Sequence, residues 1–82
     1  MTKEELKAVV FEELGNIAPE AEPAEIDPEA ELREELDIDS MDFLNLVIAL
    51  HKRLGVEIPE ADYVKLASIN ATVDYLAAKT AA

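Results

Sequence analysis

The segment LDIDSMDFLNLVIALHKRLG (residues 36–55) decides the fold, because it contains a helix start, a nearly unbroken apolar run and a helix stop. Asp39 and Ser40 are residue types that cap the N-terminus of a helix. Residues 43–50 are apolar except for Asn45, and Gly55 supplies the left-handed residue that ends many helices. A helix with so narrow a polar side is buried. We therefore predict a central helix that begins near Asp39-Ser40 and is ended by Gly55.

A second amphipathic helix is predicted near the start of the chain, from Thr2 to about Leu14. Thr2 and Glu5 have the spacing of a capping box, in which each side chain accepts a hydrogen bond from the other residue's backbone N–H. Apolar residues then recur at helical spacing. Gly15 and Asn16 are expected to end this helix, because both residue types accept a left-handed backbone.

Residues 16–39 form the long first loop of the predicted fold. Three prolines exclude a continuous helix in this loop: Pro19, Pro23 and Pro28. Asp27 followed by proline is a helix-start signal, so we expect a short helix from Pro28 to about Glu35. Three apolar side chains are expected to pin the loop to the core: Ile26, Leu32 and Leu36.

The rest of the chain is predicted to be helical apart from one extended connector. Residues 56–59 alternate like a strand, but no other segment offers them a strand partner. Residues 60–63 are expected to form a brief helical turn, and a last helix is expected from about Asn70, as its cap, to Lys79. The predicted fold is therefore all-α: a small bundle of three main helices plus one or two short helices.

The composition limits the functions that the chain can have. Residues 1–82 are too few for two domains, so we expect a single domain, and we expect it to be a monomer. Seven basic and 19 acidic residues give a net charge of −12, which disfavours nucleic acids and anionic membranes as partners. Without cysteine the chain can form neither disulfides nor thiolate metal sites. It also lacks a signal-peptide pattern and a membrane-spanning apolar run, so a cytoplasmic location is expected.

Catalysis and metal binding find little support in the sequence. His51 is the only histidine, and we interpret it as a surface residue favoured by the dipole of the central helix. No Ser-His-Asp set can be assembled around it. Asp37, Asp39 and Asp42 resemble a calcium loop only superficially, because that loop needs a small residue at position six and glutamate at position twelve. Asp42 and Ile48 stand there instead. We therefore predict neither an enzyme nor a metal site.

The stretch LDIDSMDFLNL (residues 36–46) resembles the phosphopantetheine attachment motif of acyl carrier proteins, whose usual form is L-G-x-D-S-L. Other segments also resemble that family: the N-terminal helix, the loop with Ile26-Asp27-Pro28, the connector Val56-Glu57-Ile58-Pro59 and the last helix with Val73-Asp74-Tyr75-Leu76. The resemblance covers essentially the whole chain. It implies the small helical bundle of acyl carrier proteins, with three main helices and a long first loop.

The resemblance further implies that Ser40 accepts 4′-phosphopantetheine from coenzyme A through a dedicated transferase. The thiol of this covalent cofactor would carry acyl groups as thioesters in fatty-acid, polyketide or related biosynthesis. In this family the growing chain can shelter in a cleft between the second and last main helices. The candidates to line such a cleft are Met41, Leu46, Val47, Leu50, Ile58, Ala61, Leu66, Ile69 and Val73. The alternative for each of these residues is ordinary core packing.

The partners implied by the resemblance are the phosphopantetheinyl transferase, acyl or aminoacyl ligases, and synthase and transferase enzymes with basic patches. The residues expected to meet them are Asp39, Met41, Asp42, Glu57 and Glu60. The alternative for the acidic members of this set is a merely solvated surface. A different class of function also fits the sequence: an unmodified acidic helical adaptor that binds basic proteins. Substitution of Ser40 by alanine would distinguish the two functions, because only the carrier needs the hydroxyl.

Several residues depart from the family's pattern. Asp37 replaces the usual glycine, but aspartate is among the few other residues that tolerate a positive φ. Asn45 stands where glutamate is common, and His51-Lys52-Arg53 is basic where fatty-acid carriers are usually acidic. These departures favour a specialised member outside housekeeping fatty-acid synthesis over simple drift of an acidic surface.

Overall fold

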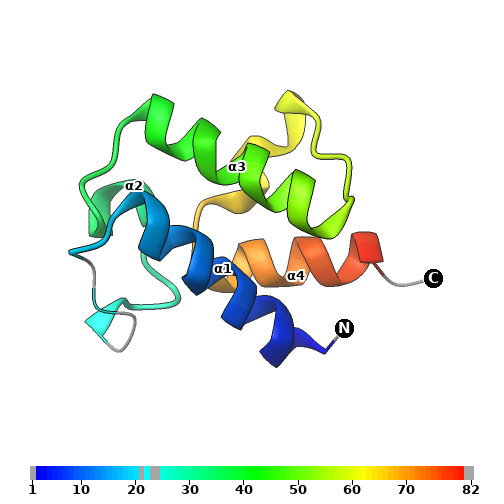
Figure 1. Cartoon of the computed structure of the whole chain (residues 1–82), viewed down its shortest axis with the longest axis horizontal. Coiled ribbons are helices and arrows are strands. Elements are labelled where there is room, and N and C mark those ends of the chain that lie inside the picture. Colours follow the sequence, from blue (N-terminus) through cyan, green and yellow to red (C-terminus); the bar gives the residue numbers. More distant parts are fainter. Residues whose placement is uncertain (1, 21, 23–24, 81–82) are drawn as a thin grey trace.

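The computed structural model describes residues 2–20, 22 and 25–80, and these residues form a helical bundle (Figure 1). In chain order its elements are α1 (Lys3–Ile17), α2 (Leu32–Glu35), α3 (Ser40–Leu54), the 3-10 helix η2 (Glu60–Leu66) and α4 (Ile69–Thr80). Within the described residues there is no strand; residues 56–59 have no regular secondary structure, and Pro59 has the extended conformation expected of a connector. The predicted all-α architecture with three main helices is confirmed for this part of the chain. Pro23 lies outside the described residues.

The core lies where α1 packs against both α3 and α4. Figure 1 shows α1 running obliquely across the first half of α4, with α3 along the opposite side of the molecule. Each main helix contributes side chains that are at most 5% exposed: Leu6, Val9, Val10, Leu14, Leu46, Val47, Leu50, Ile69, Val73 and Leu76. Full burial of one such side chain contributes roughly 1.5–3 kcal/mol, so this set dominates the stability of the bundle. No helix within residues 2–20, 22 and 25–80 is both long and apolar enough to cross a membrane.

The predicted start of α1 is confirmed, and its predicted end is wrong. The Glu5 N–H donates to Thr2 Oγ1 at 3.1 Å and the Thr2 N–H donates to Glu5 Oε1 at 2.9 Å, which completes the capping box. The helix does not stop at Gly15 and Asn16 but continues to Ile17. Ile17 packs against the core, and this burial outweighs the roughly 1 kcal/mol that a helical glycine costs.

The first loop is fastened to the start of α4 by backbone hydrogen bonds. The Leu32 N–H donates to the Ala67 carbonyl at 2.7 Å, and the Asn70 N–H donates to the Pro28 carbonyl at 3.0 Å. The side chains of Leu32 and Ile26 are buried, as expected. These contacts hold the loop against the bundle although it has little regular structure of its own.

The short helix of this loop begins later than predicted, at Leu32 instead of Pro28. Asp27 does not cap a helix: its Oδ1 accepts the Glu29 N–H at 2.9 Å, which makes a turn closed by its own side chain. In a helix from Pro28 the Leu32 N–H would donate to the Pro28 carbonyl, but it donates to the Ala67 carbonyl instead, and the Pro28 carbonyl accepts from Asn70.

The last helix begins at Ile69 and is capped by Ser68, whose Oγ accepts the Ala71 N–H at 3.0 Å. The prediction of Asn70 as the cap is therefore wrong. The Asn70 side chain instead donates to Glu29 of the first loop. The helical turn expected at residues 60–63 is the start of the longer η2, which extends to the buried Leu66.

Candidate functional site

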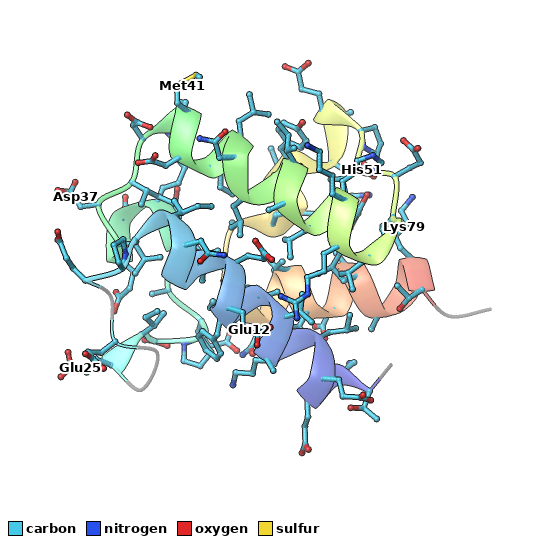
Figure 2. The ribbon with its side chains drawn as sticks, in the orientation of Figure 1. Glu12, Glu25, Asp37, Met41, His51 and Lys79 are labelled. Atoms are coloured by element: carbon cyan, nitrogen blue, oxygen red, sulfur yellow. The ribbon has the colours of Figure 1, made fainter. Side chains whose placement is uncertain are left out.

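Ser40 is the first residue of α3, and its side chain is exposed. Of the two residues expected as the cap, Asp39 and Ser40, the structure shows Asp39 as the N-cap: its Oδ1 accepts the Asp42 N–H at 2.9 Å. Asp37 has a φ of 52°, the left-handed conformation expected where the family has glycine. In Figure 2 the side chains of Asp37 and Met41 project outward at this end of the molecule. The turn before α3 thus presents the Ser40 hydroxyl to solvent at the N-terminus of a 15-residue helix.

A contact that the sequence reading missed joins Ser40 to α2. The Arg33 guanidinium donates from Nη2 to Ser40 Oγ at 3.0 Å. The sequence feature that could have drawn attention to Arg33 is its isolation: it is the only lysine or arginine between Lys7 and Lys52. Sequence spacing alone does not place Arg33 on Ser40, since α2 ends and a left-handed turn intervenes before α3 begins.

A cleft of about 700 Å³ opens beside Ser40, between α3 and η2. Phe43 of α3 and Tyr63 of η2 meet edge to face, with ring centroids 6.2 Å apart and planes at 76°. The lining combines apolar and charged side chains: Glu31, Arg33, Ser40, Phe43, Leu44, Glu60, Tyr63, Val64 and Ala67. Its volume is within the range of pockets that hold small organic ligands.

The predicted lining of an acyl cleft shares no residue with this cavity. Of that set, the side chains of Leu46, Val47, Leu50, Ile58, Leu66, Ile69 and Val73 are buried in the core, whereas Ala61 and Met41 are exposed. A smaller hollow of about 200 Å³ is bordered by Val47 and Ile58, together with Ile48, His51, Glu57 and Tyr63. The structure therefore places most of the set in ordinary packing, and their contact with an acyl chain stays a prediction.

The residues predicted to meet partner enzymes come from three parts of the chain: the start of α3, the connector that follows it and η2. Asp39 and Met41 are exposed at the start of α3, where Asp42 is half-buried. Glu60 is exposed on η2 and lines the cleft together with Ser40. Glu57 borders the smaller hollow near His51, in the last turn of α3. Their roles in recognition stay predictions.

His51 is not the surface residue expected from the sequence. It is half-buried, and its Nδ1 lies 2.7 Å from the Val56 carbonyl oxygen. Since a carbonyl only accepts, Nδ1–H is the donor. His51 therefore fastens the extended connector to the end of α3. Within the described ranges, no group of three or more His, Asp or Glu side chains could hold a metal ion.

One side of the cleft is fastened to α4 by a tyrosine–carboxylate pair. Tyr75 Oη donates to Asp62 Oδ2 at 2.6 Å. Partial burial, reinforced by this hydrogen bond, raises the pKa of Tyr75 to about 12. The same bond lowers the pKa of the Asp62 carboxyl below its ordinary value. At neutral pH the phenol is therefore a donor and the carboxylate an acceptor, which holds η2 in place.

Comparisons with known proteins agree on one family. Residues 4–76 match the family model described as "Phosphopantetheine attachment site". The chain is 35% identical over 79 residues to an acyl carrier protein of Thermosynechococcus vestitus, covering 96% of this chain and 91% of that one. It is 40% identical over 73 residues to an acyl carrier protein of Campylobacter fetus, covering 89% and 88%. A solved structure of acyl carrier protein from Enterococcus faecalis matches with a TM-score of 0.78 at 26% identity, covering 98% and 100%.

Proposed function

Because the chain belongs to the acyl carrier protein family, whose cofactor is a covalently attached 4′-phosphopantetheine, we propose that Ser40 bears this arm. When attached, the arm supplies a thiol that holds an acyl group as a thioester. The proposal rests chiefly on the exposed Ser40 hydroxyl at the N-terminus of α3. A helix N-terminus also favours the negative charge of a phosphodiester.

The environment of Ser40 fits the attachment reaction. Ser40 Oγ attacks the phosphorus of coenzyme A that bears the pantetheine, so that an Oγ–P bond forms and the P–O bond to the nucleotide breaks. The hydroxyl proton passes to a base on the transferase, and the nucleotide leaves. Arg33 donates to Ser40 Oγ, so the hydroxyl hydrogen stays available for that base. Asp39 fixes the backbone of the first turn while Ser40 reacts.

Like the acyl carrier proteins to which it is related, the chain is a carrier and not a catalyst. We propose that the acyl-handling chemistry is done by partner ligases, synthases and transferases whose basic patches meet the acidic side chains of Asp39, Asp42, Glu57 and Glu60. Charges at the rim of such an interface mainly set the association rate and its salt dependence. Cytoplasmic residence and a monomeric single domain are part of the same proposal.

The biosynthetic pathway is proposed only as fatty-acid, polyketide or related synthesis by a specialised member. The basic segment His51-Lys52-Arg53 supports specialisation less than its sequence suggests. His51 bonds to Val56, and Arg53 pairs with Glu12 at 2.5 Å and Glu13 at 3.2 Å on α1. Lys52 thus remains as the basic side chain of this turn without a described ion pair. A housekeeping ketoacyl synthase that elongates acyl groups on this carrier as fast as on its own would end the specialised assignment.

The carrier function is tested by intact mass after incubation with coenzyme A, Mg²⁺ and a promiscuous phosphopantetheinyl transferase. The chain contains two serines, so Ser68→Ala is the matched control for Ser40→Ala. The parent and Ser68→Ala proteins should each gain one phosphopantetheine, and Ser40→Ala should gain none. A folded parent that gains no mass would contradict the carrier proposal and favour the unmodified adaptor.

A further inference from the structure

The contact between Arg33 and Ser40 has a consequence for the loaded carrier. If Ser40 bears the arm, as proposed above, the phosphodiester is bonded to the Oγ that Arg33 Nη2 already reaches at 3.0 Å. We propose that Arg33 binds the phosphodiester and so directs the arm across the cleft between α3 and η2. Arg33 is then a positioning residue for the cofactor.

The charges around Ser40 make this guanidinium the natural partner of the phosphodiester. Three carboxylates lie within three residues of Ser40 in the sequence, at Asp37, Asp39 and Asp42. Attachment of the arm adds one more negative charge, which takes the formal net charge from −12 to −13. Within residues 2–20, 22 and 25–80, Arg33 forms no ion pair with any of these carboxylates. A guanidinium also matches phosphate oxygens with two parallel donors, which an ammonium cannot do.

The backbone that presents Arg33 is held in place. The neighbouring Leu32 has a fully buried side chain, and its N–H donates to the Ala67 carbonyl at 2.7 Å. Arg33 itself is exposed, so its side chain is free to follow the phosphodiester.

The direction of the arm follows from the shared lining of the cleft. Arg33 and Ser40 both line it, together with the apolar side chains of Phe43, Tyr63 and Val64. A phosphodiester bonded to Oγ and bound by the guanidinium therefore lies against the lining of the cleft. The pantetheine chain leaves this point over the apolar side chains of α3 and η2. Val64 is 81% exposed and offers its surface to the arm or its cargo.

The first test observes the guanidinium directly. The chain has two arginines, so the Arg33 Nε–H signal in a ¹⁵N-labelled sample is assigned by its loss in Arg33→Gln. Arm attachment should shift the Arg33 signal and slow rotation of its guanidinium, while the signal of Arg53, paired with Glu12 and Glu13, should stay unchanged. An Arg33 signal that is identical before and after attachment would overturn the proposal.

The second test observes the arm. Because the chain has no cysteine, a nitroxide added to the arm's thiol labels that site alone. Its effect on the amide protons of residues 43, 44, 63 and 64 reports how often the arm lies over the cleft. Arg33→Gln should reduce this paramagnetic relaxation about 1.4- to five-fold, the range expected for one exposed ion pair. Arg33→Lys should reduce it less.

The matched control is Lys52→Gln, which makes the same charge change at the other end of α3. Twelve residues of helix place Lys52 roughly 18 Å along the axis from Ser40. Relaxation in this variant should equal that of the parent, and an equal loss in Lys52→Gln and Arg33→Gln would refute a local contact. Failure to attach the arm at all would refute the carrier function, whereas attachment without any effect of Arg33 would refute only this inference.

Discussion

Asp39 has two separable roles in the proposed carrier, as a helix cap and as a charge beside Ser40, and substitution should separate them. Its Oδ1 accepts the Asp42 N–H at 2.9 Å, and the residue is exposed. Asp39→Ala removes the cap and the charge together. Asp39→Asn removes the charge and leaves a side-chain oxygen that caps a helix equally well.

The expected losses of stability follow from the cap. Replacing an N-cap aspartate by alanine costs about 1 kcal/mol, within a range of roughly 0.5–2 kcal/mol. In a domain of this size 1 kcal/mol lowers Tm by about 4–8 °C. Asp39→Asn keeps the hydrogen bond and loses only the interaction of a charge with the helix dipole, about 0.3–1 kcal/mol. Asp39→Ala should therefore melt lowest.

Thermal unfolding, monitored by circular dichroism, measures the stability of each variant. The rate of phosphopantetheine attachment measures how well the transferase recognises it. At low ionic strength, attachment to Asp39→Asn should be about two- to five-fold slower than to the parent, and near 1 M salt the difference should disappear. Glu4→Gln removes one acidic charge from the first turn of α1 and should leave the rate unchanged. Equal melting of Asp39→Ala and parent would refute the cap. Equal low-salt rates for Asp39→Asn and parent would refute the recognition role.

Three further predictions concern the bundle that holds the site. Tyr75→Phe removes the hydrogen bond to Asp62. Because the pKa of Tyr75 is raised to about 12, this bond contributes stability that is present below about pH 10 and lost as pH rises through about 12. Because the pKa of Asp62 is lowered, the bond also contributes stability that is lost as pH falls below about 4. The difference in Tm between parent and Tyr75→Phe should thus shrink at both extremes, and a constant difference would contradict the pairing. Leu32→Ala creates a cavity at a fully buried position and should lower the free energy of unfolding, measured in urea, by about 2–5 kcal/mol. Amide exchange at residues 32 and 70 should become faster. A loss under 1 kcal/mol would mean that Leu32 does not hold the loop to the core. Because the net charge is −12, millimolar Mg²⁺ or moderate salt should raise the Tm of the unmodified protein, and a flat response would mean that the charges are already well dispersed.

Features fixed by local chemistry were predictable from the sequence. The Thr2–Glu5 capping box, the Asp39 cap, the positive φ of Asp37 and the left-handed Gly55 each depend on one residue type and its immediate neighbours. The central helix followed from its apolar run. The Asp39 cap and the positive φ of Asp37 place Ser40 at an exposed helix start, which is the main element of the candidate site.

Features decided by contacts between distant segments were not predictable. Gly15 stays helical because Ile17 reaches the core, and Pro28 and Asn70 take other roles because they bond to each other across 42 residues. The Arg33–Ser40 contact depends on how the turn between α2 and α3 folds back.

The lining of the cleft was missed for a related reason. Apolar periodicity identifies the buried side of α3, but residues 43–50 are apolar almost all round. The sequence therefore could not show that Leu46, Val47 and Leu50 enter the core while Phe43 and Leu44 line the cleft.

The most direct test of the carrier function is the mass of the protein purified from cells that express it naturally, followed by peptide mapping. We predict that the protein carries one phosphopantetheine and that the modified peptide contains Ser40. An unmodified protein, or an arm mapped to Ser68, would contradict the assignment of Ser40 as the attachment site.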